Sequence, residues 1–278
     1  MNLLPTVPFG KHAVTRLILG GNPLRGNSHY SAALDEDMRA YFTVARIKQT
    51  LFDAERHGIN TVQARGDVLV QHCLREYWDE GGTLQFIAQS ASELRDLAGH
   101  VRQLAQFGAC GIYVHGTYTD QHFLDGNMGP VRDLAKAIRD TGVHTGVGTH
   151  IPEVLDLIES EGWDIDFYMA CLYNLSKHSR ESVLVTGVRQ EEHFDHDDRL
   201  KMLAHIRQTP KTCLAFKVLG AGRCCESPEH VRDAFRSTLD DIKAHDAMVV
   251  GMFPKYRDQV SENCASVREI LAGQESHA

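Results

Sequence analysis

The chain has 278 residues, 42% of them hydrophobic, and a formal net charge of −8 at pH 7. No cluster of lysine and arginine is interleaved with aromatic residues, which argues against a nucleic-acid surface. No run approaches the about 20 apolar residues of a membrane span, and the first ten residues do not resemble a signal peptide. We therefore expect a soluble, cytoplasmic protein that binds a small-molecule substrate, with no nucleic acid and no membrane as partner. Composition predicts no particular oligomeric state.

Short apolar runs alternate with longer segments of helical period, which is typical of repeated βα units and a parallel sheet. The predicted strands are residues 14–20, 60–64, 83–89, 109–115, 144–148, 165–170, 213–219 and 247–251. Helices are predicted to begin after Ser90, near Pro152 and after Ser227. Four glycines sit where a left-handed helix C-cap is expected, between a helical run and a strand; they are Gly58, Gly108, Gly142 and Gly162.

This repeat predicts a single (β/α)8 TIM barrel domain over residues 1–278. A doubly wound open sheet is the competing architecture, and it usually opens with a G-x-G-x-x-G turn. The first predicted strand instead ends in Gly-Gly-Asn-Pro at 20–23. The sequence therefore favours the barrel.

Active sites of such barrels lie at the carboxyl ends of the strands. Those ends are polar in this sequence, and the side chains in question are Asn22, His29, Gln63, Arg65, His115, His150, Tyr173 and Lys217. Because side chains alternate between the two faces of a strand, we expect Gln63, Arg65, His115 and His150 to face the barrel interior. The same count predicts Lys217 on the active-site face with Ala215 and Cys213.

These residue types suit acid–base or imine chemistry. A lysine between apolar walls and near a second cation, such as Arg65, has a lowered pKa and can act as a base or form a Schiff base. His115 and His150 would exchange protons near neutral pH. The remaining polar ends would orient substrate hydroxyls: Asn22, His29, Gln63, Arg65 and Tyr173. A divalent metal on His29, His115 and His150, with Asp67 or Asp120, is a further possibility of the pattern.

Simpler interpretations stay open for each of these residues. A lysine at a strand end often extends to solvent, and a single histidine is more often structural than catalytic. The acidic stretch 191–198 is expected to be a solvated loop and helix start, with a lid over the barrel mouth as the alternative.

The last third of the chain resembles aldo-keto reductases. The resemblance rests on Tyr-Asn-Leu at 173–175, Leu-Gly-x-Gly at 219–222, and Val-Gly-Met at 250–252 followed by Gln-Val-x-Glu-Asn at 259–263. It implies a (β/α)8 barrel that binds NADP(H), for which the matching residues are Gly220, Gly222, Lys255, Arg257 and Asn263. It also implies a catalytic Asp, Tyr, Lys and His, of which only His115 is present. The segment that begins at Gln63 replaces the expected Asp and Tyr, and Gln89 stands where the family has its Lys.

The chain also resembles a group of bacterial barrel proteins that we associate with sugar-processing genes, through residues 20–29, 148–150 and 216–222. Three hypotheses follow. The first is a lyase, aldolase or isomerase that uses Lys217, His150 and His115 on a small polyhydroxylated, sugar-like carbonyl compound. The second is an NAD(P)H-dependent oxidoreductase in which Lys217 binds the pyrophosphate and Tyr113 or Tyr173 is the acid. The third is a barrel that binds a ligand without catalysis.

Overall fold

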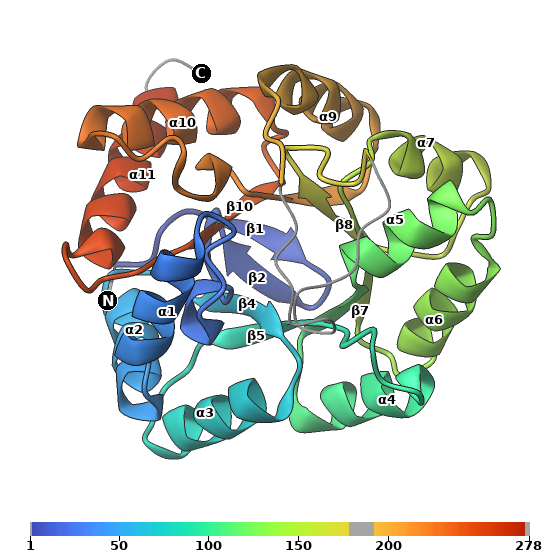
Figure 1. The fold of residues 1–278 in the computed structure, drawn as a ribbon, viewed down its shortest axis with the longest axis horizontal. Coiled ribbons are helices and arrows are strands. Elements are labelled where there is room, and N and C mark those ends of the chain that lie inside the picture. Colours follow the sequence, from blue (N-terminus) through green and yellow to red (C-terminus); the bar gives the residue numbers. More distant parts are fainter. Residues whose placement is uncertain (1, 178–191, 276–278) are drawn as a thin grey trace. The chain divides into compact units, whose positions relative to one another are not determined.

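The computed structural model describes residues 2–177 and 192–275. Eight strands close into a barrel in the order β10-β3-β4-β5-β6-β7-β8-β9, with helices around them (Figure 1). The barrel strands are β3 (Leu17–Gly20), β4 (Thr61–Arg65), β5 (Gln85–Gln89), β6 (Gly111–Val114), β7 (His144–Thr149), β8 (Phe167–Cys171), β9 (Thr212–Phe216) and β10 (Ala247–Gly251). The predicted (β/α)8 barrel is confirmed.

Two predicted strands differ from the structure by three residues at one end, whereas the bounds of the others agree within two residues. Residues 14–20 are divided between β2 (His12–Thr15), which forms an antiparallel hairpin with β1 (Thr6–Phe9), and β3. The chain passes from the hairpin to the barrel at Arg16, whose N–H continues the pairing with β1 by donating to Pro5 at 2.8 Å and whose carbonyl oxygen accepts the N–H of Met248 in β10. The strand predicted at 213–219 ends at Phe216, because Lys217 has a φ of +59°, which breaks the extended backbone.

The helices are α1 (Ala32–Tyr41), α2 (Val44–Arg56), α3 (Val68–Asp79), α4 (Leu97–Phe107), α5 (Gly116–Leu124), α6 (Gly129–Arg139), α7 (Glu153–Ser160), α9 (His196–Gln208), α10 (Pro228–Asp241) and α11 (Gln259–Glu275). The predicted starts near Pro152 and after Ser227 are confirmed, whereas the one after Ser90 is wrong. There the N–H of Ala91 donates to Nε2 of His100 within a turn, and α4 begins at Leu97 with Asp96 as its N-cap. All four glycines predicted to follow helices have positive φ.

Contacts divide the chain into two compact units, Met1–Phe86 with Val218–Ala278, and Ile87–Lys217. In the first unit, the outer face of β4 packs on helices, since Val62 and Ala64 line an apolar cavity together with Ile47 of α2 and Val70 of α3. In the second unit, α4 to α7 follow one another along strands β6 to β8 (Figure 1). A single domain with bounds at residues 1 and 278 stays a prediction.

The faces of the second unit's strands are identified by two neighbours in β8. The Tyr168 hydroxyl donates to Glu159 Oε1 of α7 at 2.7 Å, so Tyr168 faces the helices. The ring of Phe167 lies on the other face, over Gly146 of β7, where an added Cβ would come within 2.5 Å of it. Tyr113 of β6 shares this inner face, with its ring centroid 6.4 Å from that of Phe167.

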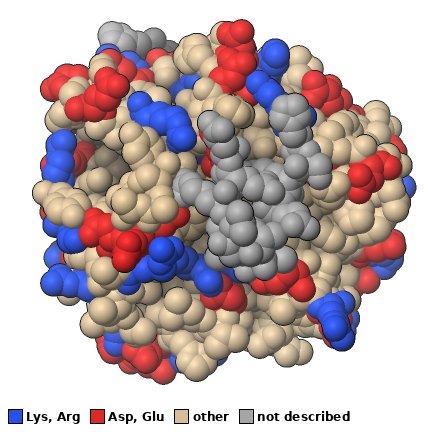
Figure 2. All heavy atoms as spheres, viewed as in Figure 1, with Lys and Arg blue, Asp and Glu red and all other residues tan. Residues whose placement is uncertain are grey.

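Acidic and basic side chains lie beside one another on the face shown in Figure 2, among the residues that the structure describes. Within the same residues, no helix is long and apolar enough to cross a membrane. The cytoplasmic location stays a prediction.

Glu159 connects α7, β8 and the segment before β9, and this predicts a measurable contribution to stability. It accepts hydrogen bonds from Tyr168, Thr209 and Lys211. Burial alone would raise the pKa of Glu159, but the bonds from Lys211, Tyr168 and Thr209 outweigh it and lower that pKa. A lowered carboxyl pKa contributes stability above the unfolded value of 4.5, and this contribution is lost as the pH falls through the folded value.

We therefore expect Glu159→Gln to lower the free energy of unfolding by about 1–2 kcal/mol at pH 7 and to weaken its fall below pH 4.5. Urea unfolding across pH measures both effects. Glu153→Gln, at an exposed position of the same helix, is the matched control. Equal stabilities of the two variants would contradict this role.

Candidate active site

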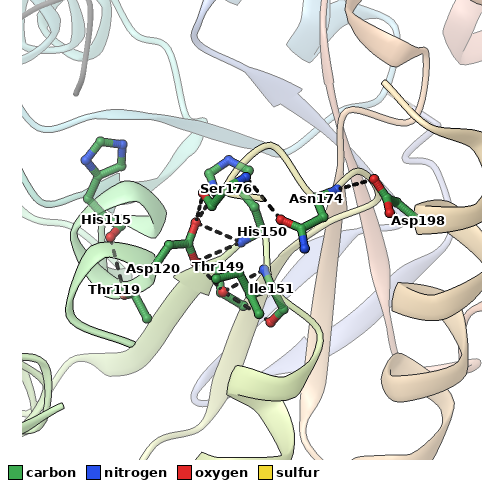
Figure 3. A network of polar contacts seen from close by, with 9 residues as sticks. All are labelled: His115, Thr119, Asp120, Thr149, His150, Ile151, Asn174, Ser176 and Asp198. Carbon is green, nitrogen blue, oxygen red and sulfur yellow. Dashed lines mark hydrogen bonds and ion pairs between the residues drawn. The ribbon is translucent and has the colours of Figure 1, made fainter. Parts of the chain in front are cut away.

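A buried aspartate and a histidine form the centre of the polar network in Figure 3. Asp120 lies on α5 and is 1% exposed, and His150 follows the end of β7 and is 5% exposed. Asp120 Oδ2 lies 2.6 Å from His150 Nδ1. The backbone N–H of His150 and the hydroxyl of Thr149 donate to Oδ1 of the same carboxylate. The inward orientation predicted for His150 agrees with the edge contact of its ring with Phe216, at 5.6 Å between centroids.

The carboxylate of Asp120 carries its charge inside the protein. Burial alone would raise its pKa, but the charge of His150 and the hydrogen bonds from His150, Ser176 and Thr149 outweigh that effect and lower the pKa. An ionised carboxylate only accepts hydrogen bonds, so Nδ1 of His150 must carry the proton that it donates to Asp120. The imidazole is therefore held in one orientation with Nε2 at its far end.

The loop after β8 completes this network. The Ser176 hydroxyl donates to Asp120 Oδ2 at 2.6 Å. Two residues earlier, the Asn174 side chain accepts the N–H of Ser176, and the Asn174 N–H donates to Asp198 on α9. The sequence pattern indicated Asp120 only as a possible metal ligand. It did not indicate Ser176, Thr149 or Asp198 as residues of the site. Serine or threonine beside a strand-end histidine is too common a pattern to have indicated them.

His115 lies at the N-terminus of α5, where its backbone N–H donates to Ser90. Its Nδ1 is 2.9 Å from the hydroxyl of Ser92. Figure 3 shows its ring apart from the Asp120–His150 pair. His115 thus has a hydroxyl at the position where His150 has a carboxylate.

The structure corrects the orientation predicted for the seventh strand. Leu214 and Phe216 are the register partners of Met169 and Cys171, which alternate with Tyr168 and so lie on the inner face. Cys213 and Ala215 therefore face the helices, contrary to the prediction. Lys217 lies beyond the strand, and its left-handed backbone directs the side chain independently of this alternation.

Lys217 is surrounded by residues from the loops after β8 and before α9. Its Nζ lies 3.9 Å from Glu192 Oε2 and 5.6 Å from the ring centroid of Phe194. Phe194 also packs on Tyr173, with 5.0 Å between the centroids. The side chains of Lys217 and Glu192 are 7% and 12% exposed, so most of each is shielded from solvent. The structure thus brings Lys217 and Tyr173 together around Phe194.

The acidic stretch 191–198 is a helix start, as expected, with residue 191 outside the described residues. Asp195 is the N-cap of α9 and accepts the N–H of Asp197. The stretch is not fully solvated, because Asp198 is buried and pairs with Lys177 at 2.9 Å.

Four predicted substrate-binding residues lie in the first unit. Asn22 Nδ2 and His29 Nε2 are 3.3 Å apart. Gln63 and Arg65 are buried, and they alternate with Val62 and Ala64, so they face away from the helices as predicted. Arg65 is paired with Asp67, which also caps α3 and contacts Arg25.

The residues implied for NADP(H) also lie in the first unit, and their charges do not suit its additional phosphate. Lys255 is ion-paired with Asp37 of α1, whose second oxygen accepts from Tyr256. The hydrogen bond with Asp37 raises the pKa of Lys255, and that with Lys255 lowers the pKa of Asp37. Arg257 pairs with Glu262 at 2.9 Å. Both cations thus already have a carboxylate. Gly220 and Gly222 form the turn after β9, and Asn263 is buried in α11.

No group of three or more His, Cys, Asp or Glu side chains among residues 2–177 and 192–275 is arranged to hold a metal ion. His29 belongs to the first unit, and His115 and His150 to the second. A metal at these three histidines stays a prediction.

No protein-family model and no curated protein matches the chain. Among solved structures, it is similar to an aldo-keto reductase from Bacillus halodurans, with a TM-score of 0.60, 10% identity and coverage of 98% of this chain and 96% of that one. A thermostable aldo-keto reductase in complex with epalrestat gives 0.55 at 12% identity, with both chains fully covered. A truncated 3-deoxy-D-arabino-heptulosonate 7-phosphate synthase from Thermotoga maritima gives 0.54 at 11%, covering 99% and 92%. The fold is thus that of the aldo-keto reductase barrels, as the sequence predicted.

The charge of Asp120 leads to a prediction about acid stability. Because its pKa is lowered in the folded protein, it stabilises the fold above its unfolded value of 3.8 and loses this effect as the pH falls through the folded pKa. Asp120→Asn breaks a buried pair and should lower the free energy of unfolding by about 3 kcal/mol at pH 7. The free energy of unfolding of this variant should also fall less steeply than that of the wild type as the pH is lowered. Urea unfolding between pH 3 and 7 tests this, with the exposed Asp133→Asn as control. Parallel curves for Asp120→Asn and the wild type would contradict it.

The paired cations lead to a prediction about NADPH. Asp37→Asn should raise the affinity for NADPH by about threefold to tenfold, since removal of the carboxylate leaves Lys255 to attract phosphate. Tryptophan quenching during NADPH titration measures this. Glu36→Gln, exposed on the same helix, should leave the affinity unchanged. Micromolar binding by the wild type, unaffected by Asp37→Asn, would contradict it.

Proposed function

We propose that this protein is an enzyme that transfers a proton on a small polyhydroxylated carbonyl compound, as isomerases and lyases do. The observation that carries the proposal is the contact between the buried Asp120 carboxylate and His150 Nδ1. A carboxylate on one ring nitrogen stabilises the imidazolium that forms when the other nitrogen accepts a proton. His150 is accordingly the general base, and His115 is the second acid–base group.

Lys217 acts beside this pair. The carboxylate of Glu192 at 3.9 Å favours the ammonium form of Lys217. In that form, Lys217 stabilises the negative charge that develops on a carbonyl oxygen when the adjacent carbon loses its proton to His150. Imine formation is the alternative role, and it requires that Lys217 first give its proton to a base such as Glu192.

The polar strand ends support a polyhydroxylated substrate. Tyr173 lies with Lys217 around Phe194 in the second unit. The first unit offers hydrogen-bonding groups for substrate hydroxyls, and these are Asn22, His29, Gln63 and Arg65. A cytoplasmic role in carbohydrate metabolism agrees with such a substrate.

Reduction by NAD(P)H is the second candidate, and the retained His115 on an aldo-keto reductase fold supports it. This reduction would use the Tyr113 hydroxyl as its acid, and that hydroxyl donates to Gln89 at 3.0 Å. The pairing of Lys255 and Arg257 with carboxylates argues against the phosphorylated cofactor. We therefore derive no step through it. A barrel that only binds a ligand is the third candidate.

Exchange of carbon-bound protons with solvent tests the proposal without a cosubstrate. Aldoses, ketoses and their acids are incubated with the protein in D2O, and proton NMR follows the signal next to the carbonyl. We expect exchange by the wild type on at least one compound and a loss of about 10²- to 10⁴-fold in His150→Gln. His205→Gln on the outer helix α9 is the control.

Borohydride separates the two roles of Lys217. If an imine forms, with loss of water, its reduction adds the mass of the substrate less one oxygen atom to the wild type and not to Lys217→Met. If Lys217 acts as a cation, no adduct forms and Lys217→Arg retains part of the exchange. Exchange that His150→Gln leaves intact would refute the proposal, and ligand binding without exchange would favour the non-catalytic barrel.

A further inference from the structure

The hydrogen bonds around Asp120 continue into a side chain that no step of the proposed reaction uses. Asp198 lies in the first turn of α9 and is 3% exposed, although it carries a carboxylate. One of its oxygens accepts the N–H of Asn174 at 3.2 Å. The other lies 2.9 Å from Lys177 Nζ. Asp198 therefore fixes the loop after β8 at two points, one on each side of Ser176.

The loop transmits this attachment to the active site through one oxygen atom. Asn174 Oδ1 accepts the N–H of Ser176 at 3.0 Å, which orients the serine. Its hydroxyl then donates to Asp120 Oδ2 at 2.6 Å, and this is the same oxygen that accepts from His150 Nδ1. A carboxylate oxygen has two lone pairs. Oδ2 receives its two short bonds from Ser176 and His150 Nδ1, with the backbone N–H of His150 at 3.3 Å, so its direction toward Nδ1 depends on where the loop holds Ser176 (Figure 3).

We propose that Asp198 is a positioning residue for His150, which acts through Asn174 and Ser176 to hold the Asp120 carboxylate in line with the imidazole. This inference rests on the proposed function in that His150 is the base. Beyond that function, Asp198 on α9 would restrict the orientation of the His150 imidazole. Asp198 itself touches neither the imidazole nor the reacting atoms.

The test follows the Nδ1 proton of His150 in the protein without substrate, labelled with ¹⁵N in histidine. Its resonance is identified by its loss in His150→Gln, and its exchange with water is measured by NMR. A well-held hydrogen bond slows this exchange. We expect Ser176→Ala and Asp198→Asn each to accelerate the exchange by about tenfold, as for the loss of one such bond. Asp197→Asn, the same change at the exposed neighbouring position, should leave the rate unchanged.

The double variant decides how Asp198 acts. If it acts through Ser176, the exchange in Ser176→Ala with Asp198→Asn is no faster than in Ser176→Ala alone. Accelerations that multiply, an Asp198→Asn rate equal to that of the wild type, or a wild type without a protected resonance would each overturn the proposal. Should Asp198→Asn fail to fold by near-ultraviolet circular dichroism, Asn174→Ala removes the same link, and an unchanged rate there overturns the proposal.

The same variants separate this inference from the proposed function. The predicted exchange pattern without turnover of any carbonyl compound would support the positioning role and refute the reaction. Turnover that depends on His150, with an unchanged Nδ1 proton in Asp198→Asn, would refute only the positioning role. Where both hold, Asp198→Asn lowers kcat and leaves KM unchanged.

Discussion

The interaction on which the active site depends is the burial of a charged carboxylate. Removing an ion from water costs several kcal/mol, and the charge persists only where donors replace the lost water. Asp120 obtains them from the end of β7, through Thr149 and His150, and from the loop after β8, through Ser176. The end of β7 and the loop after β8 must therefore keep their positions on α5, and a shift in either leaves a buried charge without a donor.

Much of the fold could be predicted from the sequence because its signals are local. Apolar runs and glycine C-caps depend on residues a few positions apart, and they indicated all eight barrel strands. The errors occur where a distant group decides. The run 14–20 is divided because Arg16 pairs with Pro5 of the hairpin through its N–H and with Met248 of β10 through its carbonyl oxygen. Ala91 donates its N–H to Nε2 of His100 where a helix was predicted.

In the candidate site, too, local patterns predicted positions correctly, whereas contacts with distant segments were missed. Alternation along β7 placed His150 correctly, because the strand is regular up to its end. It failed for Cys213 and Ala215, which face the helices. It does not apply to Lys217, because a residue with positive φ stands where the pattern assumed an extended strand. No local pattern indicated Glu192 beside Lys217, or Asp198 beneath the loop after β8, because both approach from segments distant in the sequence. The partners that determine the charge of a residue are thus harder to predict than the residue itself.

The two histidines of the second unit differ in their hydrogen-bond partners, and this difference supports the roles proposed for them. Nδ1 of His115 lies 2.9 Å from the neutral hydroxyl of Ser92. His150 meets a buried carboxylate at 2.6 Å. A hydroxyl orients an imidazole but adds no charge, whereas a carboxylate in a medium of low polarity stabilises the imidazolium strongly. A base must bear a positive charge once it has taken a proton, so the carboxylate favours His150 for that step. The protein thus has a barrel fold seen also in aldo-keto reductases, and its carboxylate–histidine pair lies one strand beyond His115, at the end of β7.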